Sequence, residues 1–203
     1  SISEAFQKGG NIGDKLGVTK LGELLKKYET DNIVAAIKEA TKDNNLEDVK
    51  VLEKNLEKYI KREDEKYDIQ SITDDLTITC ARGGYFEILK YIYEKYQKTI
   101  THTINTIEDA ILHNNLNIIK YLLENYKNDI PQRVLNDFFK TCIQKDKVNI
   151  LDYLFKNNIV DPSKIKFDIS IETAITRGHT DVIKYLIENG IFRPTKYYKN
   201  LAI

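Results

Sequence analysis

The chain has 203 residues, which is enough for one or two domains with an extended core. Its 31 basic and 31 acidic side chains cancel, so the chain as a whole has no net positive charge to attract nucleic acid or an anionic membrane. A content of 41% hydrophobic and 31% charged residues is typical of a folded protein with a large solvated surface and argues against intrinsic disorder.

No pattern in the sequence directs the chain out of the cell. No window approaches about 18 consecutive apolar residues, and the N-terminus lacks a basic-then-apolar signal pattern. The two cysteines, Cys80 and Cys142, are too few for a disulfide framework. We therefore expect an intracellular, cytoplasmic protein with no membrane partner. The frequent Lys, Asn, Ile and Tyr have A/T-rich codons, which points to a low-GC genome such as that of a protist, an intracellular bacterium or a large virus.

Residues 1–30 hold five of the nine glycines. The stretch "KGGNIGDKLG" (8–17) has the glycine content of a phosphate-binding loop, but it lacks the Gly-Lys-Ser/Thr ending and follows no apolar strand. We predict a helix fragment, a flexible glycine-rich loop and then an amphipathic helix over "KLGELLKKY" (20–28). Together they would form an N-terminal capping segment.

From residue 31 onward one pattern recurs. The segments "EDVKVLEKN", "EILKYIYEK", "NIIKYLLEN", "NILDYLFKN" and "DVIKYLIEN" align on a common anchor position, occupied by Lys50, Lys90, Lys120, Asp152 and Lys184. The anchors follow one another at intervals of 40, 30, 32 and 32 residues. The longest interval contains the charged run "KREDEK" (61–66), which we interpret as a solvated loop.

Two further positions recur with the anchor. The position six residues before the anchor is occupied by Gly, Asn or Asp, which tolerate a positive φ and therefore suit a tight turn between two helices. These residues are Asn44, Gly84, Asn114, Asp146 and Gly178. Ten residues before it stand small residues: Ala40, Cys80, Ala110, Cys142 and Ala174. The spacing predicts a helix, a sharp turn and a second helix, with the small residue letting a neighbouring helix approach. The two cysteines are therefore predicted to be core residues and not nucleophiles.

Around the last four anchors, apolar residues recur in two pairs four apart, which gives the second helix one buried stripe. A single helix pair cannot cover this stripe, so consecutive pairs must stack as a quasi-one-dimensional array. The sequence predicts an all-α solenoid of about five helix-turn-helix units over residues 31–203. A partial further unit is expected at 193–203, where Ala202 stands 28 residues after Ala174. Asn105, with Glu108 three residues on, predicts a helix start within the third unit.

The stretch "AITRGHTDVIKYLI" (174–187) resembles the ankyrin repeat family in a divergent form, with its small pair, Gly-His, acidic residue, branched aliphatic pair and Leu pair. The resemblance covers residues 33 to 190. The Thr-Pro-Leu-His opening of the family is absent, and its Gly-Ala-Asp signal survives only as Asn189-Gly190. We therefore expect reduced or absent β-hairpins between units. His179 matches the turn histidine of the family, which implies a ring hydrogen-bonded to nearby backbone.

The resemblance implies a non-enzymatic module that binds a protein through a concave face built by the first helices. In the family, the two residues ahead of the turn residue point into this groove. The predicted partner-binding residues are Arg82, Leu112, His113, Gln144, Lys145 and Arg177, beside Lys42, Asp43, Gly83 and Thr176. The arginines and Lys145 favour a partner with an acidic or phosphorylated segment.

Other functions have less support. The three histidines share no metal-ligand spacing, and the many carboxylates recur at surface positions, so we predict no catalytic residue, metal or cofactor. Tyrosines follow the anchors at Tyr91, Tyr121, Tyr153 and Tyr185, and we interpret them as packing at the edge of the stripe with their hydroxyls in water rather than as a nucleic-acid stacking platform. Self-assembly through the terminal units is the main alternative, and an enzyme with its chemistry in residues 1–30 comes last.

Overall fold

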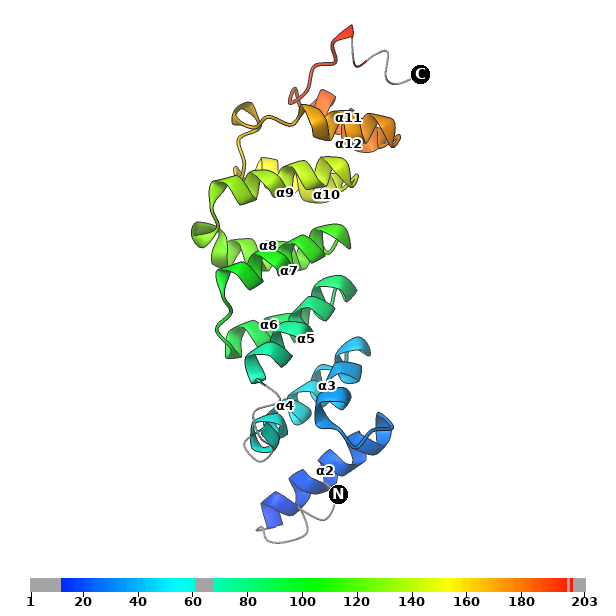
Figure 1. Cartoon of the computed structure of the whole chain (residues 1–203), viewed down its shortest axis with the longest axis vertical. Coiled ribbons are helices and arrows are strands. Elements are labelled where there is room, and N and C mark those ends of the chain that lie inside the picture. Colours follow the sequence, from blue (N-terminus) through cyan, green and yellow to red (C-terminus); the bar gives the residue numbers. More distant parts are fainter. Residues whose placement is uncertain (1–11, 61–67, 197, 199–203) are drawn as a thin grey trace. The chain divides into compact units, whose positions relative to one another are not determined.

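The computed structural model describes residues 12–60, 68–196 and 198. These residues are mostly helical, and no strand occurs among them (Figure 1), which confirms the predicted all-α class. The chain forms two compact units, Ser1–Lys98 and Thr99–Ile203, which are described separately. The charged run 61–66 and the end of the expected partial unit, with Ala202, lie outside the described residues.

The first unit contains five described helices. They are α2 (Ile12–Lys27), α3 (Ile33–Lys42), α4 (Leu46–Ile60), α5 (Ile69–Gly83) and α6 (Phe86–Lys95). The pairs α3/α4 and α5/α6 each pack together, and the two pairs also pack on each other, first helix on first and second on second.

Helix α2 contacts both α3 and α4. Its Leu21 and Leu24 are buried, and the Tyr28 hydroxyl that follows it donates to Asp48 Oδ2 of α4 at 2.7 Å. The glycine-rich loop predicted before this helix is wrong for its described part, because Gly13 and Gly17 lie inside α2. The helix forms here despite the low helix propensity of glycine.

The second unit contains three helix pairs. They are α7 (Ile100–Leu112) with α8 (Leu116–Tyr126), α9 (Gln132–Gln144) with α10 (Val148–Lys156), and α11 (Asp168–Thr176) with α12 (Thr180–Glu188). Short 3₁₀ turns at Lys127–Asp129 and Pro162–Lys164 lie in the connections between pairs. Helix α9 packs between α7 and α11, and α12 packs on α10. In Figure 1 the tight turns of this unit lie on one side and the longer connections on the other.

All five predicted turn residues have a left-handed backbone. Their φ values are 53° at Asn44, 75° at Gly84, 60° at Asn114, 55° at Asp146 and 70° at Gly178. In every case the next residue donates its backbone N–H to the carbonyl of the predicted small residue, at 2.9 Å in four turns and 3.0 Å in the fifth. This is the hydrogen bond by which a left-handed residue terminates a helix.

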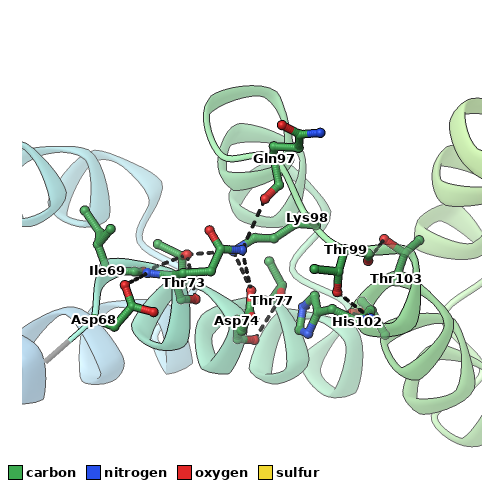
Figure 2. A network of polar contacts seen from close by, with 12 residues as sticks. Asp68, Ile69, Thr73, Asp74, Thr77, Gln97, Lys98, Thr99, His102 and Thr103 are labelled. Carbon is green, nitrogen blue, oxygen red and sulfur yellow. Dashed lines mark hydrogen bonds and ion pairs between the residues drawn. The ribbon is translucent and has the colours of Figure 1, made fainter.

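The five small residues are all fully buried, which confirms their assignment to the core. The start of α7 was predicted wrongly. The helix begins at Ile100, where Thr99 is the N-cap and accepts a hydrogen bond from the His102 backbone N–H at 3.1 Å (Figure 2). Asn105 therefore lies well inside the helix.

Polar contacts join successive second helices. The ammonium of Lys50 lies 5.8 Å from the ring centre of Tyr91, and that of Lys120 lies 5.6 Å from the ring of Tyr153. At the same position in the next pair, Asp152 Oδ1 accepts a hydrogen bond from the Tyr185 hydroxyl at 2.9 Å. In each contact the anchor residue of one pair meets the tyrosine that follows the next anchor. The hydroxyl of the half-buried Tyr185 therefore has a protein acceptor, which the prediction of a hydroxyl in water did not include.

The hydroxyl of Tyr91 also has a protein acceptor, because it donates to Glu53 Oε2 at 2.8 Å. The Glu53 side chain on α4 is only 1% exposed and also accepts from Lys95 Nζ, at 2.6 and 2.7 Å, and from the Tyr96 hydroxyl. Burial by itself would raise the pKa of Glu53, but the hydrogen bonds from these three partners and the Lys95 charge outweigh it, so the pKa is lowered from its usual 4.5.

Glu53→Gln should lower the free energy of unfolding by about 1–3 kcal/mol at neutral pH, because the buried cluster loses its charge. A carboxyl with a lowered pKa stabilises the fold above its unfolded pKa, and this contribution disappears as the pH falls through the folded value. The difference in the free energy of unfolding between wild type and Glu53→Gln should thus become smaller below pH 4.5. Urea unfolding across an acidic pH series measures it, with the exposed Glu47→Gln on the same helix as control. If the free energies of unfolding of Glu53→Gln and Glu47→Gln depended on pH in the same way, the lowered pKa of Glu53 would be contradicted.

Ala110→Leu should destabilise the protein by about 1–3 kcal/mol, because Ala110 is fully buried on α7 and extra bulk must push helices apart. Thermal and urea unfolding measure the effect. Glu108→Leu places the same side chain at an exposed position of the same helix and should stay within about 0.5 kcal/mol of wild type.

Candidate functional site

Five of the six predicted partner-binding residues lie in the second unit at the ends of its first helices. Leu112 and His113 end α7, Gln144 and Lys145 end α9, and Arg177 is the C-cap of α11. Because α9 packs between α7 and α11, and the tight turns lie on one side of the unit (Figure 1), these residues share one edge. We call it the turn-side edge. Arg82 occupies the corresponding helix end of α5 in the first unit.

The side chains on the turn-side edge differ in their solvent exposure and in the hydrogen bonds that they form. Leu112 is 44% exposed, which is unusual for a large apolar residue in this chain, and His113, Lys145 and Arg177 are also exposed. The Nδ1 atom of His113 lies 2.8 Å from the Asp109 carbonyl oxygen of its own helix. Gln144 is half-buried and donates from Nε2 to Ser170 Oγ of α11 at 3.2 Å, so it also ties two helices together.

Charge on this edge changes sign along the helices. Lys145 and Arg177 carry positive charge at the helix ends, where it is favourable to the helix dipole. Asp109 stands three residues before Leu112 and Asp137 seven before Gln144, which places both carboxylates on the same helix faces. Asp137 is exposed and pairs with Lys140 at 3.0 Å. The basic character predicted for the groove is therefore confined to the rim formed by the helix ends.

The described residues hold no group of three or more His, Cys, Asp and Glu side chains arranged to hold a metal ion. Cys80 and Cys142 are free thiols in the core, and burial raises the pKa of both well above the usual value. None of the helices in the described part of the chain is long and apolar enough to cross a membrane.

A buried lysine in the first unit was not predicted from the sequence. The Lys98 side chain has no exposed surface, and its Nζ donates to Thr73 Oγ1 at 2.6 Å and to Asp74 Oδ1 at 2.7 Å on α5 (Figure 2). Gln70 bridges Asp74 Oδ1 and the Gln97 carbonyl, at 3.2 Å each. Burial lowers the pKa of Lys98, while Asp74 opposes the shift. Because the ammonium bonds to groups of its own unit, we assign the cluster a structural role.

A hollow of about 490 Å³ lies on α11 and α12. It is lined by Ala174, Ile175, Gly178, His179, Thr180, Ile183, Lys184, Ile187 and Glu188. His179 does not have the hydrogen bond expected from the family pattern for its Nδ1 atom, which is buried and has no partner among the described residues. None of the predicted partner-binding residues lines this hollow.

A second hollow of about 470 Å³ lies on the side of the longer connections, between the start of α9 and the segment after α10. Its lining includes Gln132, Asn136, Asp161 and Lys164. Gln132 Nε2 already donates to Asn136 Oδ1 and to the Ile159 carbonyl, at 3.0 and 3.2 Å. The polar groups here serve mainly to fix the connection between pairs.

Comparison of the chain with protein-family models gives no match, and comparison with curated proteins gives none either.

Both thiols should resist modification in the folded protein, because they are buried and protonated. An aromatic disulfide reagent at neutral pH is expected to label neither cysteine in native buffer and both in denaturant. Rapid labelling of Cys80 or Cys142 in the native state would mean that the small-residue position is open to solvent.

Proposed function

We propose that the chain is a non-enzymatic, ankyrin-like repeat module that binds a partner protein through the ends of its first helices. The observation that carries the proposal is the turn-side edge of the second unit. There, three packed helices of similar geometry end in side chains of different chemistry: apolar Leu112, aromatic His113, and basic Lys145 and Arg177. Side chains that differ from helix to helix, on helices of similar geometry, are suited to recognising one specific partner.

The framework beneath this edge favours binding by preorganisation. Each helix end is held by a left-handed turn and a backbone hydrogen bond to a buried small residue. Gln144 links α9 to α11 directly below the rim. Side chains on such a support lose little conformational entropy when a partner docks. A specific contact of ordinary size would bury about 800 Å² on each partner.

The chemistry of the edge indicates the kind of partner segment. Lys145 and Arg177 favour carboxylate or phosphate groups, and guanidinium binds both in a bidentate way. Leu112 offers an apolar contact close to this rim. We infer an acidic or phosphorylated segment that also carries an apolar side chain.

The state of the reactive side chains and of the tyrosines favours binding over catalysis or nucleic-acid recognition. The two thiols are buried, and Lys98, whose pKa is lowered, already donates hydrogen bonds to Thr73 and Asp74. The tyrosines that would stack bases are engaged by anchor residues in the three pairs described above.

The test compares three full-length baits in affinity capture from extract of the source cells. Lys145→Glu with Arg177→Glu reverses the charge at the C-terminal ends of α9 and α11 and should weaken recovery of the partner by at least about tenfold. Arg133→Glu with Lys166→Glu makes the same change of charge near the N-terminal ends of the same helices and should recover the partner as wild type does. All three should show the same circular dichroism. Equal recovery by the first variant would refute the turn-side edge.

A further inference from the structure

The turn between α5 and α6 differs from the other described turns within helix pairs in two residues. The residue before the left-handed turn position is Gly83 here, whereas the other pairs have exposed side chains there: Asp43, His113, Lys145 and Arg177. The residue after the turn position is Tyr85, whereas the other pairs have Asn45, Asn115, Lys147 and His179. A missing side chain and a large aromatic ring thus occur together at this turn.

The backbone conformation does not require a glycine at residue 83. Gly84 has the left-handed φ of 75°, whereas Gly83 is the last residue of α5 and its φ is not positive. Glycine destabilises a helix relative to alanine. The helix by itself would therefore favour a residue with a side chain at this position.

The ring of Tyr85 occupies the space that a side chain at residue 83 would need. A β-carbon on Gly83 would lie 2.8 Å from Tyr85 Cε1 and closer still to Cε2 and Cζ, which are distances that β-carbons essentially never show. The backbone of Tyr85 is held by its N–H, which donates to the Cys80 carbonyl at 3.0 Å, and by its carbonyl, which accepts from the Leu89 N–H at 3.1 Å. Gly83 therefore allows the ring to lie against the end of α5.

The hydroxyl of Tyr85 differs from those of the tyrosines that bind carboxylates. Tyr85 is half-buried, and its hydroxyl forms no hydrogen bond with the described residues. The hydroxyls of Tyr91 and Tyr185, in contrast, donate to Glu53 and Asp152. A tyrosine in an interface supplies both an apolar ring and a hydroxyl that can bind a polar group, and it has few torsions to immobilise.

We propose that Tyr85 is a contact residue through which the first unit binds an acidic segment of a partner protein, and that Gly83 positions its ring. The inference rests on the proposed partner binding and extends it to the first unit. The ring replaces the exposed side chain of the other pairs, and its hydroxyl donates to a carboxylate. Arg82 is exposed and adds positive charge at the same helix end, where guanidinium binds carboxylates in a bidentate way. The segment therefore carries Asp or Glu beside an apolar side chain.

Urea unfolding of the full chain tests the position of the ring. Gly83→Ala should not raise the unfolding midpoint, because it forces the Tyr85 ring aside, whereas in a Tyr85→Ala background it should raise the midpoint through better helix propensity. Gly22→Ala on α2 is the matched control, since a β-carbon there would meet no side chain within 4 Å, and it should raise the midpoint of wild type. An equal rise from Gly83→Ala in both backgrounds would refute the positioning role.

Peptide selection tests the contact itself. A phage library of random short peptides is selected on the immobilised wild-type chain and depleted on Tyr85→Ala, and the peptides that remain should be rich in Asp and Glu next to apolar residues. A fluorescent copy of the most enriched peptide should bind Tyr85→Phe and Gly83→Ala at least about fivefold more weakly than wild type. The first variant lacks the hydroxyl, and the second displaces the ring. Gly22→Ala should bind as wild type does, and circular dichroism should be the same for all.

The outcomes separate this contact from the turn-side edge. A selection that enriches no peptide, or only peptides without acidic residues, overturns the role of Tyr85. So does an enriched peptide that binds Tyr85→Phe and Gly83→Ala as tightly as wild type. A second selection, depleted on Lys145→Glu with Arg177→Glu, tests the turn-side edge of the second unit. Its failure would refute that edge and leave the result for Tyr85 standing.

Discussion

Each described helix pair depends on one hydrogen bond: the backbone N–H after a left-handed residue donates to the carbonyl of a fully buried small residue. The bond satisfies a carbonyl that the end of the helix leaves free. The left-handed residue reverses the chain within a few residues, and only Gly, Asn and Asp adopt this conformation cheaply. The same small residue also lies in the core. It therefore determines both the geometry of the turn, through its carbonyl, and the close packing of the helices, through its small side chain. The five pairs therefore share one geometry although most of their other residues differ.

The two units stabilise their helices by different means. Among the described residues, the charged side chains that are buried belong to the first unit, in Glu53 and Lys98. Each is surrounded by hydrogen-bonding partners from helices or loops distant in sequence. A buried charge of this kind contributes little net stability but penalises any packing that would leave it unpaired. The core of the second unit instead contains the two largest fully buried side chains, Phe138 and Phe139.

Two surfaces of the second unit have contrasting chemistry. The turn-side edge carries charged, polar and apolar side chains close together, which suits recognition of a specific segment. The hollow on α11 and α12 is lined by three isoleucines, and the charged side chains of Lys184 and Glu188, which lie 3.8 Å apart, also line it. Ile187 on α12 is exposed, whereas Leu123 at the equivalent position of α8 is buried.

The helices, the turns and the small core positions could be predicted from the sequence, because each depends on residues close together along the chain. A positive φ selects Gly, Asn or Asp at one position, and the apolar spacing selects the buried face of a helix. It also identified the helix ends that form the turn-side edge. Local signals did fail where two of them competed: Thr99, and not Asn105, caps α7. They failed again at Gly13 and Gly17, which lie inside α2 despite the low helix propensity of glycine.

Which polar side chains are buried, and what they bind, is known only from the packing of helices that are distant in sequence. Glu53 accepts a hydrogen bond from Tyr91, 38 residues later in the sequence, and Tyr185 donates to Asp152, 33 residues earlier. Neither contact can be predicted from the pattern of neighbouring residues. Lys98 could not be distinguished from a surface lysine for the same reason. Likewise, the stripe of α12 has the same sequence pattern as the stripes before it. Its exposure depends on whether another helix pair lies against it, and that is a property of the packed molecule.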